Sequence, residues 1–384
     1  FTITVNDVNE APTDITLSAN SINENMPVAS TVGTLTSTDP DSGNTFTYSL
    51  SGTDAASFSI VGNALKTTAS FNFEAKSSYA ITVTTTDQGS LAFSKNFTIT
   101  VIDVNEAPTD ITLSATSINE NMASGSTVGT LTTTDPDAAN TFTYSLSGTD
   151  AASFSIVGNA LKTAASFNFE AKSSYAITVT TTDQGSLTFS KNFTITVNDV
   201  NEAPTDISLS ATSINENMAS GSTVGVLTTT DVDAGNTFTY TLGGADAASF
   251  SISSGLLITA ASFNYEAKNS YSITLTSTDQ GLLAFTKNFT ITVNDVNEAP
   301  TSSNASVTTD EDTNLILAAS HFGNYLDPEG TSLASVKIKN RTGKGVLRYN
   351  NGGIWHSVAT DQVIAAADIT AGKLRFSPST NEFG

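Results

Sequence analysis

Short acidic motifs recur along this 384-residue chain at a fixed spacing. The string Asp-Val-Asn-Glu-Ala-Pro occurs four times, 96 residues apart, and starts at Asp7, Asp103, Asp199 and Asp295. Four more acidic motifs follow the first copy, at Asn23-Glu-Asn25, Asp39-Pro-Asp41, Phe71-Asn-Phe-Glu74 and Asp87-Gln-Gly89. Carboxylate and amide oxygens without nearby lysines are hard ligands that suit Ca²⁺, which takes about six to eight of them. These motifs therefore predict calcium binding.

The composition of the chain excludes several other classes of function. Its 37 Asp and Glu against 15 Lys and Arg give a net charge of -22. So few cations cannot neutralise phosphates, which excludes nucleic acids and anionic membrane surfaces as partners. The chain has no Cys, so disulfides and thiolate zinc sites are excluded. No apolar run is long enough to predict membrane insertion.

The elements that carry these motifs are predicted to be strands. Phe97, Ile99 and Val101 alternate with threonines, and the same alternation occurs around Tyr48 and Tyr79. A period of two indicates half-buried strands. About seven such segments, separated by turn residues, fit into 96 residues and indicate a two-sheet sandwich. No window predicts a helix.

The repeat also predicts the domain organisation. Residues 7–102 and 103–198 differ at only ten positions, and a period of 96 suits one small domain rather than a solenoid unit. We expect a last strand of a preceding repeat at 1–6, repeats at 7–102, 103–198 and 199–294, and a divergent, incomplete domain at 295–384.

The five acidic motifs, in this order and spacing, resemble those of the cadherin repeat. The likeness is closest to the cadherin-like repeats of large secreted bacterial adhesins, in which Asp-Val-Asn-Glu-Ala-Pro-Thr is a common linker form, and it covers residues 1 to about 300. The resemblance implies an all-β fold of tandem seven-strand Greek-key β-sandwiches with immunoglobulin-like architecture, arranged as a linear rod. It also implies calcium ions between successive domains.

The resemblance further implies a ligand set for each junction between domains. The upstream domain supplies two glutamates, the linker supplies Asp, Asn and Glu, and the downstream domain supplies aspartates. The first complete junction would use Glu24, Glu74, Asp103, Asn105, Glu106, Asp135, Asp137 and Asp183. The second would use Glu120, Glu170, Asp199, Asn201, Glu202, Asp231, Asp233 and Asp279. The third would use Glu216, Glu266, Asp295, Asn297, Glu298 and Asp327, and a half-site at the start would use Asp7, Asn9, Glu10, Asp39, Asp41 and Asp87.

Some residues depart from the family pattern or lie outside it. Asn72, Asn168 and Asn264 stand where the family usually has Asp, which lowers the charge of each junction. We expect Asp14 and Asp54 to be solvated turn residues. We expect Lys76 and its counterparts in the other repeats, Lys172 and Lys268, to be solvated partners of local acids.

The divergent unit keeps echoes of the motifs at Asp310-Glu-Asp312 and Asp327-Pro-Glu-Gly330. It resembles another cadherin-like repeat of bacterial surface proteins. It holds both histidines, His321 and His356, and the only tryptophan, Trp355. A Trp-His pair on a β surface could stack on a sugar, and a half-buried Trp beside an incidental His is the alternative. Because both histidines lie in this one unit and acidic clusters recur at every junction, we expect no enzyme activity.

The sequence thus predicts an extracellular or cell-surface protein region. We expect a calcium-rigidified extension of a large bacterial adhesin, which holds an adhesive tip away from the cell or forms a fibre. Its partners would be further repeats of the same polypeptide, a partner cell surface or another copy, as in homophilic adhesion. One alternative is a carbohydrate-binding module with glycans as partners. Another is a filament subunit, in which residues 1–5 of one chain complete the divergent unit of the next, with Glu311 and Glu382 as added ligands.

Overall fold

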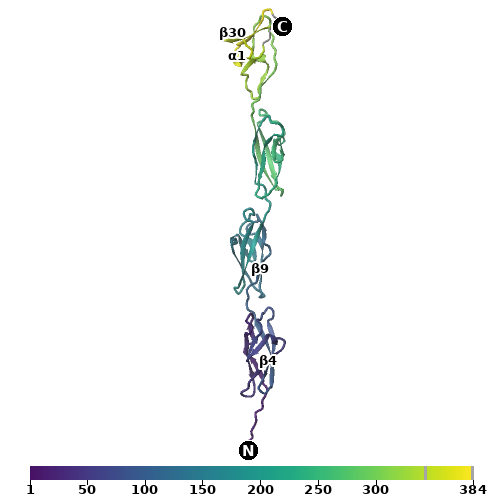
Figure 1. Ribbon diagram of the computed structural model, residues 1–384, viewed down its shortest axis with the longest axis vertical. Helices are drawn as coiled ribbons and strands as arrows, with labels where there is room; N and C mark the ends of the chain where they lie inside the picture. Colours follow the sequence, from purple (N-terminus) through teal and green to yellow (C-terminus); the bar gives the residue numbers. More distant parts are fainter. Residues whose placement is uncertain (341–343, 382–384) are drawn as a thin grey trace. The chain divides into compact units, whose positions relative to one another are not determined.

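The computed structural model describes residues 1–340 and 344–381, so Glu382 lies outside the described residues. Contacts divide the chain into two compact units, residues 1–200 and 201–384, which are treated separately. The first unit contains two β-sandwiches, and the second contains a third sandwich and the divergent unit (Figure 1). No helix among the described residues is long and apolar enough to cross a membrane.

The first sandwich has eight strands in two four-stranded sheets. One sheet has the order β1-β3-β6-β5 and the other β2-β8-β7-β4. All neighbours are antiparallel except β2 and β8, which run parallel with Ile22 opposite Val101. The strands are β1 (Asp14–Leu17), β2 (Ser21–Asn23), β3 (Thr31–Thr38), β4 (Thr47–Ser51), β5 (Phe58–Val61), β6 (Ala64–Thr67), β7 (Ser78–Thr86) and β8 (Ala92–Ile102). The sequence pattern did not predict β2, because three residues are too few to show a period.

The second and third sandwiches repeat this arrangement strand for strand. The second consists of β9 (Asp110–Leu113), β10 (Ser117–Asn119), β11 (Thr127–Thr134), β12 (Thr143–Ser147), β13 (Phe154–Val157), β14 (Ala160–Thr163), β15 (Ser174–Thr182) and β16 (Thr188–Asn198). The third consists of β17 (Asp206–Leu209), β18 (Ser213–Asn215), β19 (Thr223–Thr230), β20 (Thr239–Gly243), β21 (Phe250–Ser253), β22 (Leu256–Thr259), β23 (Ser270–Thr278) and β24 (Ala284–Asn294). One 3₁₀ turn precedes the fifth strand of each sandwich, at Ala55–Ser57, Ala151–Ser153 and Ala247–Ser249.

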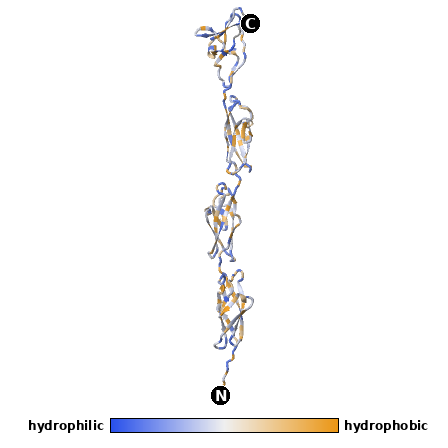
Figure 2. Cartoon of the chain, viewed as in Figure 1, coloured by the Kyte–Doolittle hydropathy of each residue, from blue (hydrophilic) through white to orange (hydrophobic). Residues whose placement is uncertain are grey.

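The core of each sandwich is made by the apolar half of the alternating strands. In the first, Ile15, Leu65 and Ile99 are fully buried, and Phe71 stacks on Tyr79 with ring centroids 4.3 Å apart. The buried apolar residues form one core cluster; Figure 2 colours each residue along the chain by its hydropathy. Burial of one such side chain contributes about 2 kcal/mol, so the predicted strand faces are confirmed by the packing.

The prediction that Asp14 and Asp54 are solvated turn residues is wrong in part. Asp54 lies in a turn but its side chain is mostly buried, whereas Asp14 is 43% exposed but begins the strand β1. The Asp54 carboxylate pairs with Lys76 Nζ and accepts the Ala80 N–H at 2.8 Å, and its side chain is only 14% exposed. The Lys76 contact, followed by this N–H, lowers the pKa of Asp54. Asp14 pairs with Lys95 at 2.7 Å. The strand register brings these partners together across the sequence, and the same ion pairs recur in the next two sandwiches.

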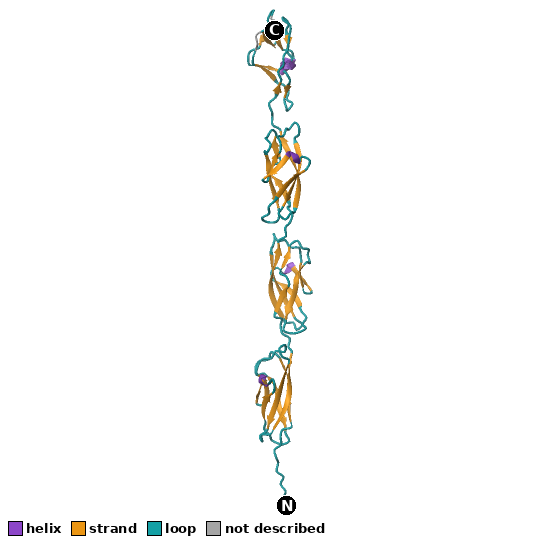
Figure 3. Ribbon diagram, turned by 90° about the vertical axis from the view of Figure 1, so that its right-hand side faces the viewer, coloured by secondary structure: helices purple, strands orange, loops and turns teal. Residues whose placement is uncertain are grey.

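The divergent unit has shorter strands and a smaller core. Its sheet order is β26-β32-β29-β30, with two further strand pairs, β25-β27 and β28-β31. Its elements are β25 (Thr301–Ser302), β26 (Leu315–Ile316), a 3₁₀ turn at Ala319–Phe322, β27 (Tyr325–Leu326), β28 (Ser335–Ile338), β29 (Gly345–Asn351), β30 (Ile354–Ser357), β31 (Gln362–Ala365), α1 (Ala366–Thr370) and β32 (Leu374–Pro378). The helix α1 was not predicted, since five residues show no helical period. Strands dominate the chain and helical segments are short (Figure 3).

Two features of the divergent unit bear on the sequence predictions. Trp355 pairs with Asn350 and His356 with Tyr349, so the two adjacent side chains point to opposite faces of the sheet and form no Trp-His platform.

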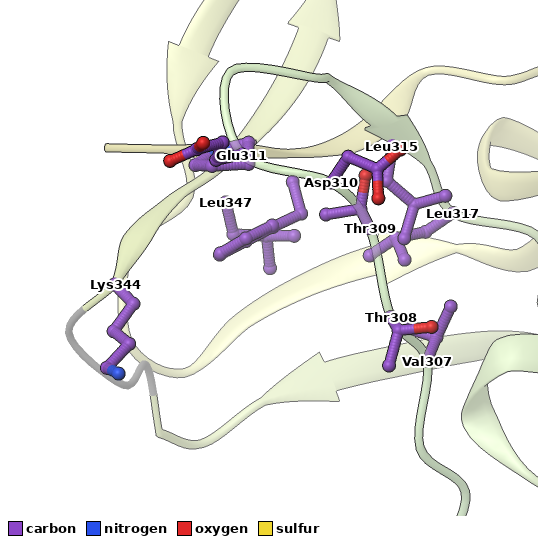
Figure 4. Close-up of a pocket in the computed structure, with 11 residues that line it drawn as sticks. Val307, Thr308, Thr309, Asp310, Glu311, Leu315, Leu317, Lys344 and Leu347 are labelled. Atoms are coloured by element: carbon purple, nitrogen blue, oxygen red, sulfur yellow. The ribbon is translucent and has the colours of Figure 1, made fainter. Parts of the chain in front are cut away.

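A cavity of about 600 Å³ lies between the coil at 307–311 and the side chains of Leu315, Leu347 and Phe376 (Figure 4).

Candidate metal sites at the domain junctions

Four of the predicted ligands of the first junction lie together. Glu24, Glu74, Glu106 and Asp137 each place one carboxylate oxygen so that all four lie within 4.8 Å of one another. Glu24 directly follows β2, Glu106 lies in the linker after β8, and Asp137 follows β11. Because β2 and β8 are parallel, their ends bring Glu24 beside the linker. The register of one strand pair thus sets the upstream half of the site.

Glu24 holds its surroundings in place through both of its carboxylate oxygens. The residue is only 2% exposed. Its Oε2 accepts the Phe73 N–H at 2.8 Å, and its Oε1 accepts the Val104 N–H at 2.9 Å. The same pair of contacts is made by Glu120 and Glu216 in the next two sandwiches. Glu24 therefore fixes a loop and the linker, in addition to belonging to the carboxylate cluster.

The downstream domain binds the same linker with its own aspartates. Asp137 Oδ2 accepts the Glu106 N–H at 2.8 Å, and Asp135 Oδ1 accepts the Asp137 N–H at 3.0 Å. Asn105 Nδ2 donates to Asp183 Oδ2 at 2.9 Å. A Cβ at Gly185 would lie 2.5 Å from Asn105 Nδ2, which explains the glycine in this motif. The linker is thus held between two domains by carboxylates.

Several carboxylate oxygens of this junction have no hydrogen-bond partner. They are buried and belong to Glu106 (Oε2), Asp135 (Oδ2) and Asp137 (Oδ1). None of these carboxylates forms an ion pair with a Lys or Arg of the described residues. Orphaned buried anions are costly, so an oxygen-preferring divalent cation fits this donor set.

The pKa values of several carboxyl groups at this junction are also shifted. Burial raises the pKa of Asp103, and the charge of Asp137 adds to that effect. Burial also raises the pKa of Glu106 and of Asp135, with contributions from neighbouring carboxylates. Burial opposes ionisation of Asp183 as well, but the Asn105 amide and three backbone N–H groups outweigh it and lower its pKa. Three carboxylates of this junction, Asp103, Glu106 and Asp135, are therefore harder to ionise than usual, and a positive charge nearby would favour their ionised form.

The third junction shows a similar cluster with one ligand that the sequence prediction missed. Glu216, Glu266 and Glu298 place oxygens within 4.8 Å of one another. The Glu298 N–H donates to Glu329, whose Oε2 is buried and without a partner. The predicted Asp327 accepts the Tyr325 hydroxyl at 3.0 Å and the Glu329 N–H at 3.2 Å, the second contact matching that of Asp135 with the Asp137 N–H. The match of Asp327-Pro-Glu329 to Asp135-Pro-Asp137 is the signal that could have identified Glu329. Asp295 and Asn297 are exposed.

The half-site at the start repeats the downstream pattern. Asp7, Glu10 and Asp41 place oxygens within 4.8 Å of one another. Asn9 Nδ2 donates to Asp87 Oδ2 at 2.8 Å, and the Asp39 Oδ2 atom is buried without a partner. The sequence prediction therefore grouped these residues as the structure does.

The predicted ligands of the second junction divide between the two units. Glu120, Glu170 and Asp199 belong to the first unit, and the remaining five belong to the second. Within the second unit, Asn201 Nδ2 donates to Asp279 Oδ2 at 2.9 Å, and the Glu202 N–H donates to Asp233 Oδ2 at 2.9 Å. The Asp233 N–H in turn donates to Asp231 Oδ1 at 3.0 Å. The second unit thus repeats the downstream contacts of the first junction. In the first unit, Glu120 repeats the contacts of Glu24.

One further residue of the junctions was not predicted as functional. Asn25 has a φ of +57°, a backbone region that Asn tolerates better than most residues. In this conformation its Nδ2 donates to Glu106 Oε1, and Asn217 makes the same contact with Glu298. The second Asn of the Asn-Glu-Asn motif therefore orients a linker glutamate.

Comparison with known proteins places this geometry in a family. The Cadherin domain profile matches residues 19–102, 114–198 and 210–295. Human protocadherin gamma-A5 is 29% identical over 294 residues, which cover 69% of this chain and 32% of that protein. Human protocadherin Fat 4 is 30% identical over 238 residues, which cover 57% of this chain and 5% of that protein. The chain therefore spans a third or less of these two relatives.

Solved structures share the fold. The extracellular domain of protocadherin gammaB4 matches with a TM-score of 0.60 and 21% identity, over 98% of this chain and 63% of that one. Domains EC22-24 of mouse cadherin-23 match with a TM-score of 0.57 and 24% identity, over 75% of this chain and all of that one. These relatives are animal proteins, so the closer likeness to bacterial repeats stays a prediction. The matched repeats cover most of the sequence, and the chain belongs to the cadherin family.

Proposed function

We propose that this chain is a calcium-binding, calcium-rigidified extension region of a large bacterial surface or secreted adhesin. The chain is an extracellular or cell-surface array of tandem cadherin repeats. The proposed role is mechanical: ions at each junction, held by the predicted ligands, tie domains 7–102, 103–198, 199–294 and 295–384 into a stiff series. The bacterial origin rests on the form of the linker motif.

One observation carries the proposal. At the first junction, carboxylates from two domains and their linker lie within 4.8 Å of one another, and three of the junction's buried oxygens have no partner. A bound Ca²⁺ would supply the positive charge that these oxygens lack. The residues of this chain do the rest: Glu24 anchors the upstream loop and linker, and Asp137 anchors the linker from downstream.

Replacement of a single ligand tests the assignment. Asp137→Asn removes one charge and weakens the acceptor of the Glu106 N–H, so we expect fewer bound Ca²⁺ ions per chain by isothermal titration calorimetry. The control is Asp54→Asn, which breaks the ion pair with Lys76 and changes a carboxylate that belongs to none of the predicted ligand sets. The control should lower the melting temperature while calcium stoichiometry stays at the wild-type value. Equal stoichiometry in the two variants would show that the ligands are misassigned.

A second candidate function, a self-assembling filament, has its own structural support. Phe1, Ile3 and Val5 are exposed, and residues 1–5 have the same sequence as residues 97–101 of β8, the last two of which pair with β2. In the divergent unit, Thr308–Asp310 align with β2 but form no strand, and they line the 600 Å³ cavity with Glu311. A strand from a second copy could enter there and add to the exposed sheet edge.

Deletion of residues 1–6 tests the filament. In millimolar Ca²⁺, sedimentation velocity of the intact chain should then show oligomers that grow with concentration, and the deletion should remove them. An intact chain that stays monomeric at high concentration would exclude strand exchange and leave the extension proposal untouched.

A further inference from the structure

The divergent unit differs from the repeats in charge. Residues 295–384 contain seven Lys and Arg against ten Asp and Glu, whereas residues 7–102 contain three against nine. All three arginines of the chain lie in this unit, at positions 341, 348 and 375. Two of them, Arg348 and Arg375, lie in its four-stranded sheet and are described by the structure. In this acidic chain, the guanidinium groups of arginine therefore occur only in the divergent unit.

Arg348 and Arg375 lie on one face of the sheet. They are direct partners in the register of β29 and β32. Their neighbours Leu347, Tyr349 and Leu374 pack into the core, so alternation along each strand turns the two arginines to the opposite face. On β30, Trp355 is the register partner of Asn350, which alternation places on the same face as Arg348.

The side chains on this face are held in a specific arrangement. The Arg375 guanidinium lies over the Trp355 ring, with Cζ 4.0 Å from the centroid. A guanidinium stacked in this way keeps N–H donors at its edge for a ligand. Two polar atoms of β32, Arg375 Nε and Ser377 Oγ, are buried and have no hydrogen-bond partner.

The two arginines are also not neutralised. The ion pairs found in the described part of this unit use Lys337, Lys339 and Lys373, and neither arginine takes part in them. Guanidinium groups without a carboxylate partner keep N–H donors that a carboxylate ligand can accept.

We propose that this surface, the Arg–Trp face (Arg348, Asn350, Trp355, Arg375 and Ser377), binds an acidic glycan through the carboxylates of its uronic acid residues. A guanidinium fork matches a planar carboxylate with two parallel hydrogen bonds. The Asn350 amide offers neutral hydrogen-bond partners for sugar hydroxyls. The strands of this sheet are only two to seven residues long, whereas a stable protein interface uses about 20–30 residues a side. The face therefore suits a short saccharide better than a folded protein partner.

The only tryptophan of the chain makes the test direct. The probe is a hexasaccharide of alternating glucuronic acid and N-acetylglucosamine, and its carboxyl-reduced form is the neutral control. We expect the acidic hexasaccharide to change the fluorescence of Trp355 in a saturable way in the intact chain. Binding should weaken with added salt, as charge pairing requires, and should persist in chelator because no junction carboxylate takes part. Its outcome is thus separate from that of the calcium proposal.

Charge-matched variants locate the site. Arg375→Gln and Arg348→Gln should each weaken binding roughly tenfold or more, the range for a lost hydrogen bond to a charged group. Lys339→Gln removes the same charge away from the face and should leave affinity within about twofold. Trp355→Phe, measured by calorimetry, should weaken binding and keep the melting temperature close to that of the wild type. The proposal is overturned if the hexasaccharide fails to bind at millimolar concentration, if the reduced form binds equally well, or if Lys339→Gln weakens binding as much as the arginine variants.

Discussion

Removal of Ca²⁺ by a chelator is expected to lower the melting temperature of this chain on the order of 10 °C. Extracellular calcium modules bind with dissociation constants of about 10⁻⁴ to 10⁻³ M. At 10 mM Ca²⁺, each ion then stabilises the folded state by about 1.4 to 2.7 kcal/mol through mass action. A shift of 1 kcal/mol moves the midpoint of a domain of this size by about 4–8 °C. Scanning calorimetry at rising Ca²⁺ measures this shift directly.

Removal of Ca²⁺ by a chelator should also make the linkers between the domains more flexible. In chelator, the buried oxygens of Glu106, Asp135 and Asp137 have no counter-charge, so the linker should open to hydrate them. Small-angle scattering should then show a wider range of maximum dimensions. Mg²⁺, which demands octahedral geometry and dehydrates reluctantly, is the control and should restore little of either signal. Scattering curves that superimpose with and without Ca²⁺ would refute the stiffening mechanism.

Replacement of Glu24 by Ala is expected to destabilise the first sandwich by about 2–5 kcal/mol, even in chelator. The change leaves the Phe73 and Val104 N–H groups without their acceptor, and each buried unsatisfied donor costs about 1–3 kcal/mol. Amide hydrogen exchange should report lost protection at Val104 specifically. Chemical unfolding gives the total change in free energy.

A neighbouring glutamate supplies the control for this variant. Glu74 belongs to the same cluster but is exposed, and its Oε2 accepts only from the Asn72 amide among the bonds found. Glu74→Ala removes the same charge while the backbone contacts of Glu24 stay intact. It should weaken calcium binding and leave stability in chelator nearly unchanged. If both variants unfold alike in chelator, Glu24 acts through its charge alone and not by holding the linker.

The near-identical 96-residue copies were enough to predict the tandem sandwiches and the kind of ligand at each junction. Both are local properties. Alternation at Phe97, Ile99 and Val101 indicates which side of a strand is buried. The positions of the acidic motifs indicate which turns and linkers carry carboxylate oxygens. A copy repeated three times also makes chance motifs improbable. The fold class could therefore be predicted from the residues, and the grouping of Asp7, Glu10 and Asp41 followed from the resemblance to the cadherin repeat.

Contacts between distant residues were decided only by the tertiary structure. The bond from the Val104 N–H to Glu24 spans 80 positions and depends on the short parallel pair β2–β8, which leaves no periodic trace in the sequence. The same holds for Asp54, a turn residue whose ion pair with Lys76 depends on contacts between residues far apart in the sequence. Likewise, Arg375 stacks on Trp355 because two strands flank β29. Sequence patterns specify which side chains face the same way, but strand pairing decides which of them meet, because the free energy of pairing comes from the whole sheet.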